Sequence, residues 1–555
     1  MCLKPQPFPE MPAGTLKLAS KLLPDTNMYR QIGDKLADFI CDQDFVDLYP
    51  VEGKPALSPT LLALVTVFQM MEGLSDRQAA AQVVTRIDWK YALHLPLDYA
   101  GFNYSVLSEF RDRLVVHKAS CKVFDQMLVR LKELGLISKH STQRTDSLAI
   151  IGAVRQLSRL ELVLETVRVA LEGLEKTDRA WFKLHIPDSW GERYGQPAQQ
   201  ERLVKTKGTA AQTETRALIR QTGQDGQWLI ALLKSSFTPL SLQQLPQVAV
   251  LQQVWDQQFE VVEGNPTLRE KVELPTSQII ETPHDPEVHY SQKRNSSWKG
   301  YKVQVTETVE LDKPHLITDV TTTLATTTDG EVLQEIQQKL EGREVKPAVQ
   351  LGDMGYVNGE NLHNSQLSGI ELVGPIRADT SLQARTEGGV SLEQFELDYQ
   401  KKTALCPGGK HSISWSQSEE RGQTVVKIKF SGRSCAECFL YELCVMGNKN
   451  KSTKPPGRLL KLRAYHQEVV ARRKEQKQET FKAAYRQRSG VEASLSELVR
   501  GHGLRVARYI GLAKESLRNL LIGTGANLKR AARWLGGIRP IPLRKRGLAS
   551  LGGNA

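Results

Sequence analysis

The chain has 555 residues, of which 40% are hydrophobic and 25% are charged, and its formal net charge is +12. This length allows several domains with a buried core, and the lack of a signal-peptide pattern and of any apolar run near eighteen residues predicts a cytoplasmic protein with no membrane partner. Residues 451–555 hold 24 Lys and Arg against 6 Glu and no Asp, which favours a polyanion such as DNA as the partner, although solvated basic helices have the same composition.

Residues 1–140 have the pattern of a helical domain. Ser58-Pro59 supplies an N-cap and a first-turn proline for one helix, Gly73 ends it, and Ser75-Asp-Arg-Gln78 forms a capping box that begins the next. A third helix is predicted from about Ser105. Three short helices with a tight turn fit a DNA-binding helix-turn-helix, and they fit a helical bundle without that function equally well.

A strand and a long helical segment come next. Residues 141–151 form a short strand candidate that carries Asp146 among apolar and β-branched neighbours, where an acid needs a partner or a cation. Apolar residues then recur every three or four positions as far as Leu174, which predicts a packing seam on a long helix. We expect residues 152–290 to form a helical insertion without catalytic residues.

Between residues 295 and 365 the pattern changes to that of an α/β unit. Residues 299–308 and 315–324 predict two antiparallel strands, and Asp329-Gly330 opens a helix. The next apolar strand ends at Asp353. An acid at the carboxyl end of such a strand is well placed to bind a ligand.

Residues 366–454 are predicted to form a β-rich insertion with a cluster of four cysteines: Cys406, Cys435, Cys438 and Cys444. A Cys-x2-Cys pair with two further cysteines can supply four thiolates for a structural tetrahedral Zn²⁺. The alternative is four reduced cysteines that only pack. In a chain of this length, seven cysteines do not suggest a disulfide framework.

Beyond Lys461 the chain is predicted to be helical and basic as far as Leu535, and residues 536–555 are predicted to be a basic disordered tail. If residues 485–503 form one helix, Tyr485, Arg488 and Glu492 fall on one face, with Glu492 at the rim of the buried stripe. An incidental charge pair on an amphipathic helix would have the same spacing.

The order of these elements is that of a ribonuclease-H-like α/β core: a strand acid, an antiparallel hairpin, a helix, a strand-end acid and a late helix with a glutamate. We therefore predict a core built from residues 141–151, 295–365 and 455–535, with the helical N-terminal domain and the two insertions attached. The expected metal ligands are Asp146, Asp353 and Glu492. Carboxylates without histidines favour hard divalent ions, and two ions of Mg²⁺ or Mn²⁺ would catalyse in-line phosphoryl transfer.

The sequence resembles the DDE transposases of bacterial insertion sequences, which have a ribonuclease-H-like core and a Tyr-x2-Arg-x3-Glu signature. The matching residues are Tyr485, Arg488 and Glu492, Asp353 in Gly-Asp-Met-Gly-Tyr356, Asp146 in Arg-Thr-Asp-Ser147, and near the N-terminus Leu74-Ser-Asp-Arg-Gln78, Asp88-Trp-Lys-Tyr91 and Ser108-Glu-Phe-Arg111. Two features depart from the family pattern. Val499 stands where the signature places a lysine, and Asp146 and Asp353 are far apart for a minimal core.

The resemblance implies metal-dependent nicking at the ends of an insertion sequence, followed by attack of the freed 3′-hydroxyl on target DNA. It implies double-stranded DNA as the partner, both terminal inverted repeats and target, a homodimer that holds two ends, and a location at the bacterial nucleoid. Candidate DNA contacts are Tyr485, Arg488, Arg500, Arg505, Arg508, Lys529 and Arg530. Two alternatives stay open: an endonuclease that cuts without joining, and a DNA-binding protein whose carboxylates are vestigial.

Overall fold

A computed structural model describes residues 1–539 except 200–203, 205–206, 294, 421–422 and 447–454. All but the first four residues of the predicted tail, 536–555, lie outside the described residues. In the described ranges, no helix is both long and apolar enough to cross a bilayer.

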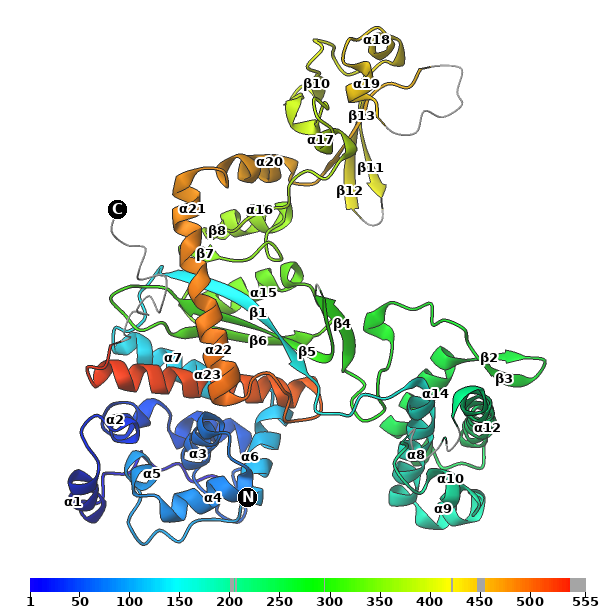
Figure 1. The fold of residues 1–555 in the computed structure, drawn as a ribbon. Helices are drawn as coiled ribbons and strands as arrows, with labels where there is room; N and C mark the ends of the chain where they lie inside the picture. Colours follow the sequence, from blue (N-terminus) through cyan, green and yellow to red (C-terminus); the bar gives the residue numbers. More distant parts are fainter. Residues whose placement is uncertain (200–203, 205–206, 294, 421–422, 447–454, 540–555) are drawn as a thin grey trace.

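The N-terminal region is helical, as predicted (Figure 1). The Ser58 side chain accepts a hydrogen bond from the Leu61 amide at the start of α3, and Gly73 ends this helix with a φ of +67°. A capping box at Ser75 begins α4. The α-helices of this region are α1 (Ala13–Leu22), α2 (Met28–Lys35), α3 (Pro59–Glu72), α4 (Asp76–Thr85), α5 (Ile87–Ala92), α6 (Ser105–Val116) and α7 (Lys122–Glu133).

A six-stranded mixed sheet lies at the centre of the molecule (Figure 1). Its strands are β1 (Thr142–Ile151), β4 (His289–Lys293), β5 (Ser296–Thr308), β6 (Ile317–Leu324), β7 (Val349–Leu351) and β8 (Glu371–Val373). The order is β4-β5-β1-β7-β8, with β6 also paired to β5. β5 is antiparallel to β1, β4 and β6, whereas β7 is parallel to β1 and to β8. Helices α15 (Asp329–Gly342) and α16 (Gly359–Leu367) precede and follow β7.

Helix α23 (Leu512–Leu535) lies between the N-terminal helices and the sheet (Figure 1). Two glycines permit this close packing: a Cβ on Gly523 would lie 2.8 Å from Val320 Cγ2 of β6, and a Cβ on Gly525 would lie 2.5 Å from Met71 Cγ of α3. One hydrophobic core accordingly extends from the N-terminal helices through α23 to the sheet. These parts form one packed body, and most of the basic helix α23 faces protein.

A first insertion with its own hydrophobic core protrudes from this body (Figure 1). It contains α8 (Arg159–Thr177), α9 (Arg179–His185), α10 (Trp190–Tyr194), α12 (Gly208–Leu233), α13 (Leu240–Gln243), α14 (Pro246–Gln258) and the hairpin of β2 (Phe259–Val262) and β3 (Asn265–Leu268). The predicted seam of α8 is buried in this core. The hairpin was not predicted from the sequence, because its strands have only four residues each.

A second insertion, residues 382–463, protrudes beyond β8 and is called the cysteine domain below (Figure 1). It contains α17 (Leu382–Arg385), β9 (Glu396–Asp398), β10 (Thr403–Leu405), β11 (Ser414–Glu420), β12 (Gln423–Lys429), α18 (Gly432–Ala436), α19 (Tyr441–Cys444) and β13 (Leu459–Arg463). It contains β-strands, as predicted, but the predicted range, residues 366–454, also included β8, which belongs to the central sheet, and ended before β13. The chain then returns to the sheet through α20 (His466–Glu475).

Candidate active site

The pairing of β1 with β7 brings Asp146 and Asp353 together near the carboxyl end of β7. β1 and β7 are parallel, and their last paired residues are Arg144 and Leu351. Asp146 and Asp353 each lie two residues beyond that pair, at the same level of neighbouring strands. Two acids from distant parts of the sequence are therefore neighbours, Asp146 on β1 and Asp353 just beyond the end of β7, because β1 and β7 are paired in this register.

Asp146 is buried and held by two donors. Its Oδ2 accepts a hydrogen bond from Arg488 Nη2 at 2.7 Å, and its Oδ1 accepts one from the Ser147 amide at 2.8 Å. Burial raises the pKa of Asp146 above its ordinary value; Arg488 and the Ser147 amide oppose this rise, and the nearby Asp353 adds to it. A carboxylate whose charge is disfavoured in this way gains from a further cation.

A third carboxylate, that of Asp329 at the start of α15, lies beside Asp353. A Cβ on Gly355 would lie 2.9 Å from both Asp329 Oδ2 and Asp353 Oδ1, so a side chain at this position would collide with both acids. The Lys293 ammonium lies 3.7 Å from Asp329 Oδ2 and 4.0 Å from Asp353 Oδ2. Asp329 was not selected from the sequence, because an acid in the first turn of a helix ordinarily serves the helix dipole.

Tyr356 lies near all three acids, Asp146, Asp329 and Asp353. Its side chain is fully buried, and its hydroxyl donates to Gln304 Oε1 at 2.5 Å. Burial raises the pKa of Tyr356 well above its ordinary value, and the charges of Asp329, Asp146 and Asp353 raise it further. The carboxylates of Asp146, Asp329 and Asp353, called the acidic cluster below, thus all lie near one phenol.

The helix predicted over residues 485–503 is broken. A 3₁₀ turn over Gln487–Gly490 separates α21 (Glu479–Arg486) from α22 (Val491–His502). Arg144 stabilises this break, because its Nη1 donates to Gln487 O at 2.9 Å and would lie 2.2 Å from a Cβ on Gly490. The prediction assumed 3.6 residues per turn throughout, whereas a 3₁₀ turn has about 3.0, so residues after it are rotated away from the predicted face.

Glu492 comes just after this 3₁₀ turn. It lies in the first turn of α22 and is exposed, and within the described part of the chain it forms no hydrogen bond or ion pair. Tyr485, which precedes the 3₁₀ turn, and Arg488, which lies within it, do face the cluster. Burial raises the pKa of Tyr485, Arg488 lowers it, and Asp353 and Asp146 raise it.

The acidic cluster has the donor chemistry of a hard divalent cation. The atoms that it could offer to an ion are all carboxylate oxygens. The Lys293 ammonium already places a positive charge near both Asp329 and Asp353. Among the described residues, no three His, Cys, Asp or Glu side chains are already arranged around one point as the ligands of an ion. The residues therefore fit Mg²⁺ or Mn²⁺ by type, and a complete ligand set requires a rearrangement of side chains.

The candidate DNA contacts beyond α21 differ in how accessible they are. Arg500 and Arg505 are exposed. Arg508 is partly buried, and its Nη1 donates to Leu74 O of the N-terminal region at 2.7 Å. Lys529 lies 3.6 Å from Glu497 Oε1. Arg500 and Arg505 are thus the members of this group best placed to contact DNA.

Arg530 belongs to a buried ion-pair network instead. Its guanidinium contacts Glu307 and Glu497, each at 2.9 Å, and Glu307 is fully buried. Glu307 also pairs with Arg144 at 2.6 Å and accepts a hydrogen bond from Ser494 Oγ. Because this guanidinium is already paired inside the protein, we no longer expect Arg530 to bind a DNA phosphate. The density of basic residues in the sequence does not show that Arg530 pairs with a buried glutamate on a distant strand.

Two family models match the chain. The model described as Transposase DDE domain matches residues 405–532, which include Glu492, and the model described as Transposase domain (DUF772) matches residues 18–113. Asp146 and Asp353 lie between the two matches. Comparisons with curated proteins and with solved structures give no match. The two family matches, one in each half of the chain, support a DDE-type transposase.

Proposed function

We propose that the chain is a DNA transposase with a ribonuclease-H-like core, which cleaves the ends of an insertion sequence and joins the freed 3′-hydroxyl to target DNA. The observation that carries the proposal is the parallel pairing of β1 with β7, which supports a shared site for Asp146 on β1 and Asp353 just beyond β7. The two transposase family matches support the same function. The partners are the inverted repeats of the element and the target duplex, and a homodimer would hold the two ends together.

Asp146 and Asp353 serve in this proposal as ligands of two divalent ions, Mg²⁺ or Mn²⁺. Such ions supply the charge stabilisation that in-line attack at a phosphodiester requires. Arg488 neutralises Asp146 in the DNA-free chain, and a DNA phosphate can replace that carboxylate as its partner. Tyr485, which stacks on Phe481, offers an aromatic face to a displaced base.

Glu492 is proposed as the third ligand, and it requires a change at the Gln487–Gly490 turn. If this turn rewinds into an α-helix, α21 and α22 become continuous, and Glu492 returns to the face that carries Tyr485 and Arg488. The exposed Glu492 side chain has no described partner to lose in this movement. Binding of DNA by Arg488 would free Asp146 at the same time.

A strand-transfer assay tests the function. The DNA that flanks the coding region supplies the terminal sequence, which is prepared as a pre-cleaved duplex with a free 3′-hydroxyl and mixed with the full-length protein, a target plasmid and Mg²⁺. We expect covalent joining of the duplex to the plasmid. Cleavage of an intact end without joining would identify an endonuclease, and DNA binding without either reaction would identify a vestigial binding protein.

A further inference from the structure

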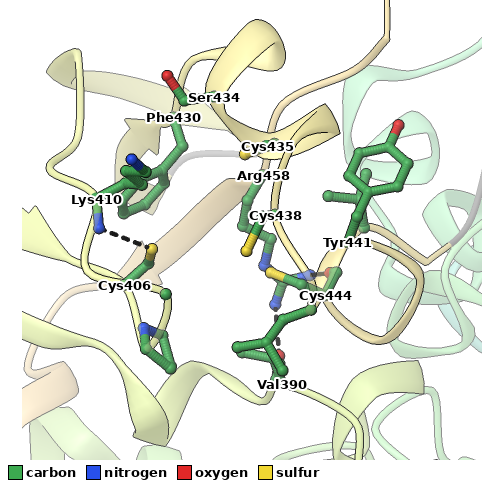
Figure 2. Close-up of a pocket in the computed structure, with 14 residues that line it drawn as sticks. Val390, Cys406, Lys410, Phe430, Ser434, Cys435, Cys438, Tyr441, Cys444 and Arg458 are labelled. Carbon is green, nitrogen blue, oxygen red and sulfur yellow. Dashed lines mark hydrogen bonds between the residues drawn. The ribbon is translucent and has the colours of Figure 1, made fainter.

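The four clustered cysteines meet at one small cavity in the cysteine domain (Figure 2). Cys406 follows β10, Cys435 lies in α18, Cys438 lies between α18 and α19, and Cys444 ends α19. All four line a cavity of about 20 Å³, and all four are free thiols. A space of this size is enough for a single ion but not for an organic ligand.

The turn after Cys406 approaches a second cysteine closely. A Cβ on Gly408 would lie 2.9 Å from Cys438 Sγ and 3.7 Å from Cys406 Sγ, so glycine allows the two sulfur atoms to face the same space. Gly409 continues the turn with a φ of +73°, and the Lys410 amide then donates to Cys406 Sγ at 3.3 Å. This amide contact fixes the orientation of the Cys406 side chain, as hydrogen bonds from outside the ligand set do at metal sites.

The helices that carry Cys435 and Cys444 bury little side-chain surface. Among the described residues, neither α18 nor α19 contains a buried residue, and the core of the cysteine domain has seven buried hydrophobic side chains. Cys435 and Cys444 are among the partly buried residues that pack against this core. Domains with small cores often gain stability from disulfides or a metal, and these cysteines form no disulfide.

A partly buried cation lies next to the cavity. Arg458, one of the residues that line it, donates from Nη1 to Cys444 O at 2.8 Å, and its Nε is buried without a hydrogen-bond partner. A divalent ion with four thiolates carries a net charge of about −2, which a neighbouring guanidinium would partly offset. The position of Arg458 therefore matches the charge of a thiolate-bound metal better than that of four neutral thiols.

We propose that Cys406, Cys435, Cys438 and Cys444 bind one structural Zn²⁺ that fixes α18 and α19 to the turn after β10. Four thiolates in a closed set select zinc, with Zn–S distances of about 2.3 Å. Within the described residues the sulfur atoms are not yet arranged at the distances of a closed site. Binding would therefore draw the α18–α19 segment towards Cys406.

Metal analysis of the full-length protein, purified under reducing conditions without added metal, tests the proposal. We expect one zinc per chain, and we expect Cys438→Ser to lose it. Cys121→Ser, a substitution of a partly buried cysteine outside the cluster, serves as the matched control and should retain the metal. This measurement needs no DNA, so its result is independent of whether the chain is a transposase.

A second measurement covers the case in which Cys438→Ser fails to fold. Titration of the unsubstituted protein with a mercurial reagent should release one zinc as four thiols react, and reconstitution with Co²⁺ should give the absorption of a tetrahedral tetrathiolate site. Protein without zinc, with iron in its place, or with full zinc content after Cys438→Ser would overturn the proposal.

Discussion

The acidic cluster brings together residues that lie far apart in the sequence, whereas the cysteine cavity is lined by cysteines from the single segment 406–444, and the two sites are supported by different parts of the fold. Asp146 and Asp353 are fixed by paired strands inside a large continuous core. Three of the four cysteines lie in or between two short helices, and the domain core has seven buried hydrophobic residues in its described part. We expect the first site to stay folded without its ligand and the second to gain much of its order from one. A metal would then contribute chemistry where the scaffold is already rigid and stability where it is not.

The largest effect is expected from Asp353→Asn. Loss of one anionic ligand removes charge stabilisation from the reacting phosphate, so cleavage of element-end DNA should fall by about 10²-fold or more. DNA binding should be unchanged within error, because the substitution leaves the strands and the basic surface intact. Gel-based cleavage and binding assays measure both, with the exposed Asp312→Asn as control. Equal cleavage by the two variants would show that the acidic cluster is not the active site.

Metal removal should distinguish the two regions next. A strong chelator should abolish cleavage through the acidic cluster, and it should also loosen the cysteine domain. Proteolysis monitored by mass spectrometry should then show new cuts confined to residues 382–463, while the sheet and the N-terminal helices remain protected. Restoring Mg²⁺ alone should not reverse these cuts, but restoring Zn²⁺ should. Unchanged protection of residues 382–463 would show that this domain needs no metal.

The third carboxylate can be identified by comparing Glu492→Gln with Asp329→Asn. We expect Glu492→Gln to lose cleavage by about 10²-fold without a change in thermal stability, since its side chain is exposed and has no described partner. Asp329 is buried and lies 3.3 Å from the Lys302 ammonium, so Asp329→Asn should lower the free energy of unfolding by about 2 kcal/mol. If only Asp329→Asn removed activity and both variants were folded, Asp329 would replace Glu492 in the ligand set.

Lys293→Ala tests whether the ammonium between Asp329 and Asp353 competes with a divalent ion. Because the Lys293 side chain is 52% exposed, the solvent screens its charge, and we expect the Mg²⁺ concentration for half-maximal cleavage to fall only about 2- to 5-fold. Lys346→Ala, which removes a lysine paired with Glu341 outside the cluster, should leave that concentration unchanged. A higher Mg²⁺ requirement in Lys293→Ala would contradict competition.

The smallest effect concerns the exposed basic residues. If Arg500 or Arg505 contacts a phosphate, its change to Ala should reduce the slope of the logarithm of DNA affinity against the logarithm of salt concentration by about 0.9. Arg530→Ala should instead lower thermal stability, because it leaves Glu307 with one buried cation fewer. A salt slope that changes for Arg530→Ala in the folded protein would return that residue to the DNA interface.

Local patterns in the sequence predicted the elements that depend on local interactions. The caps at Ser58 and Ser75, the strand with Asp146 and the strand before Asp353 all follow from nearby side chains. The break at Gly490 could not be predicted in this way, since it depends on Arg144 from a distant strand. The burial of Arg530 depends likewise on Glu307 of β5, a partner that a count of charges does not reveal.

The central claim is that Asp353 binds the divalent ion used in DNA cleavage, and replacement of its carboxylate by a thiol tests this most directly. Thiolates bind Mg²⁺ poorly and accept the softer Mn²⁺ more readily. The account predicts that Asp353→Cys is inactive in Mg²⁺ and recovers cleavage in Mn²⁺, while the unsubstituted protein is active in both. Full activity of Asp353→Cys in Mg²⁺, or cleavage by any form without a divalent ion, would contradict it.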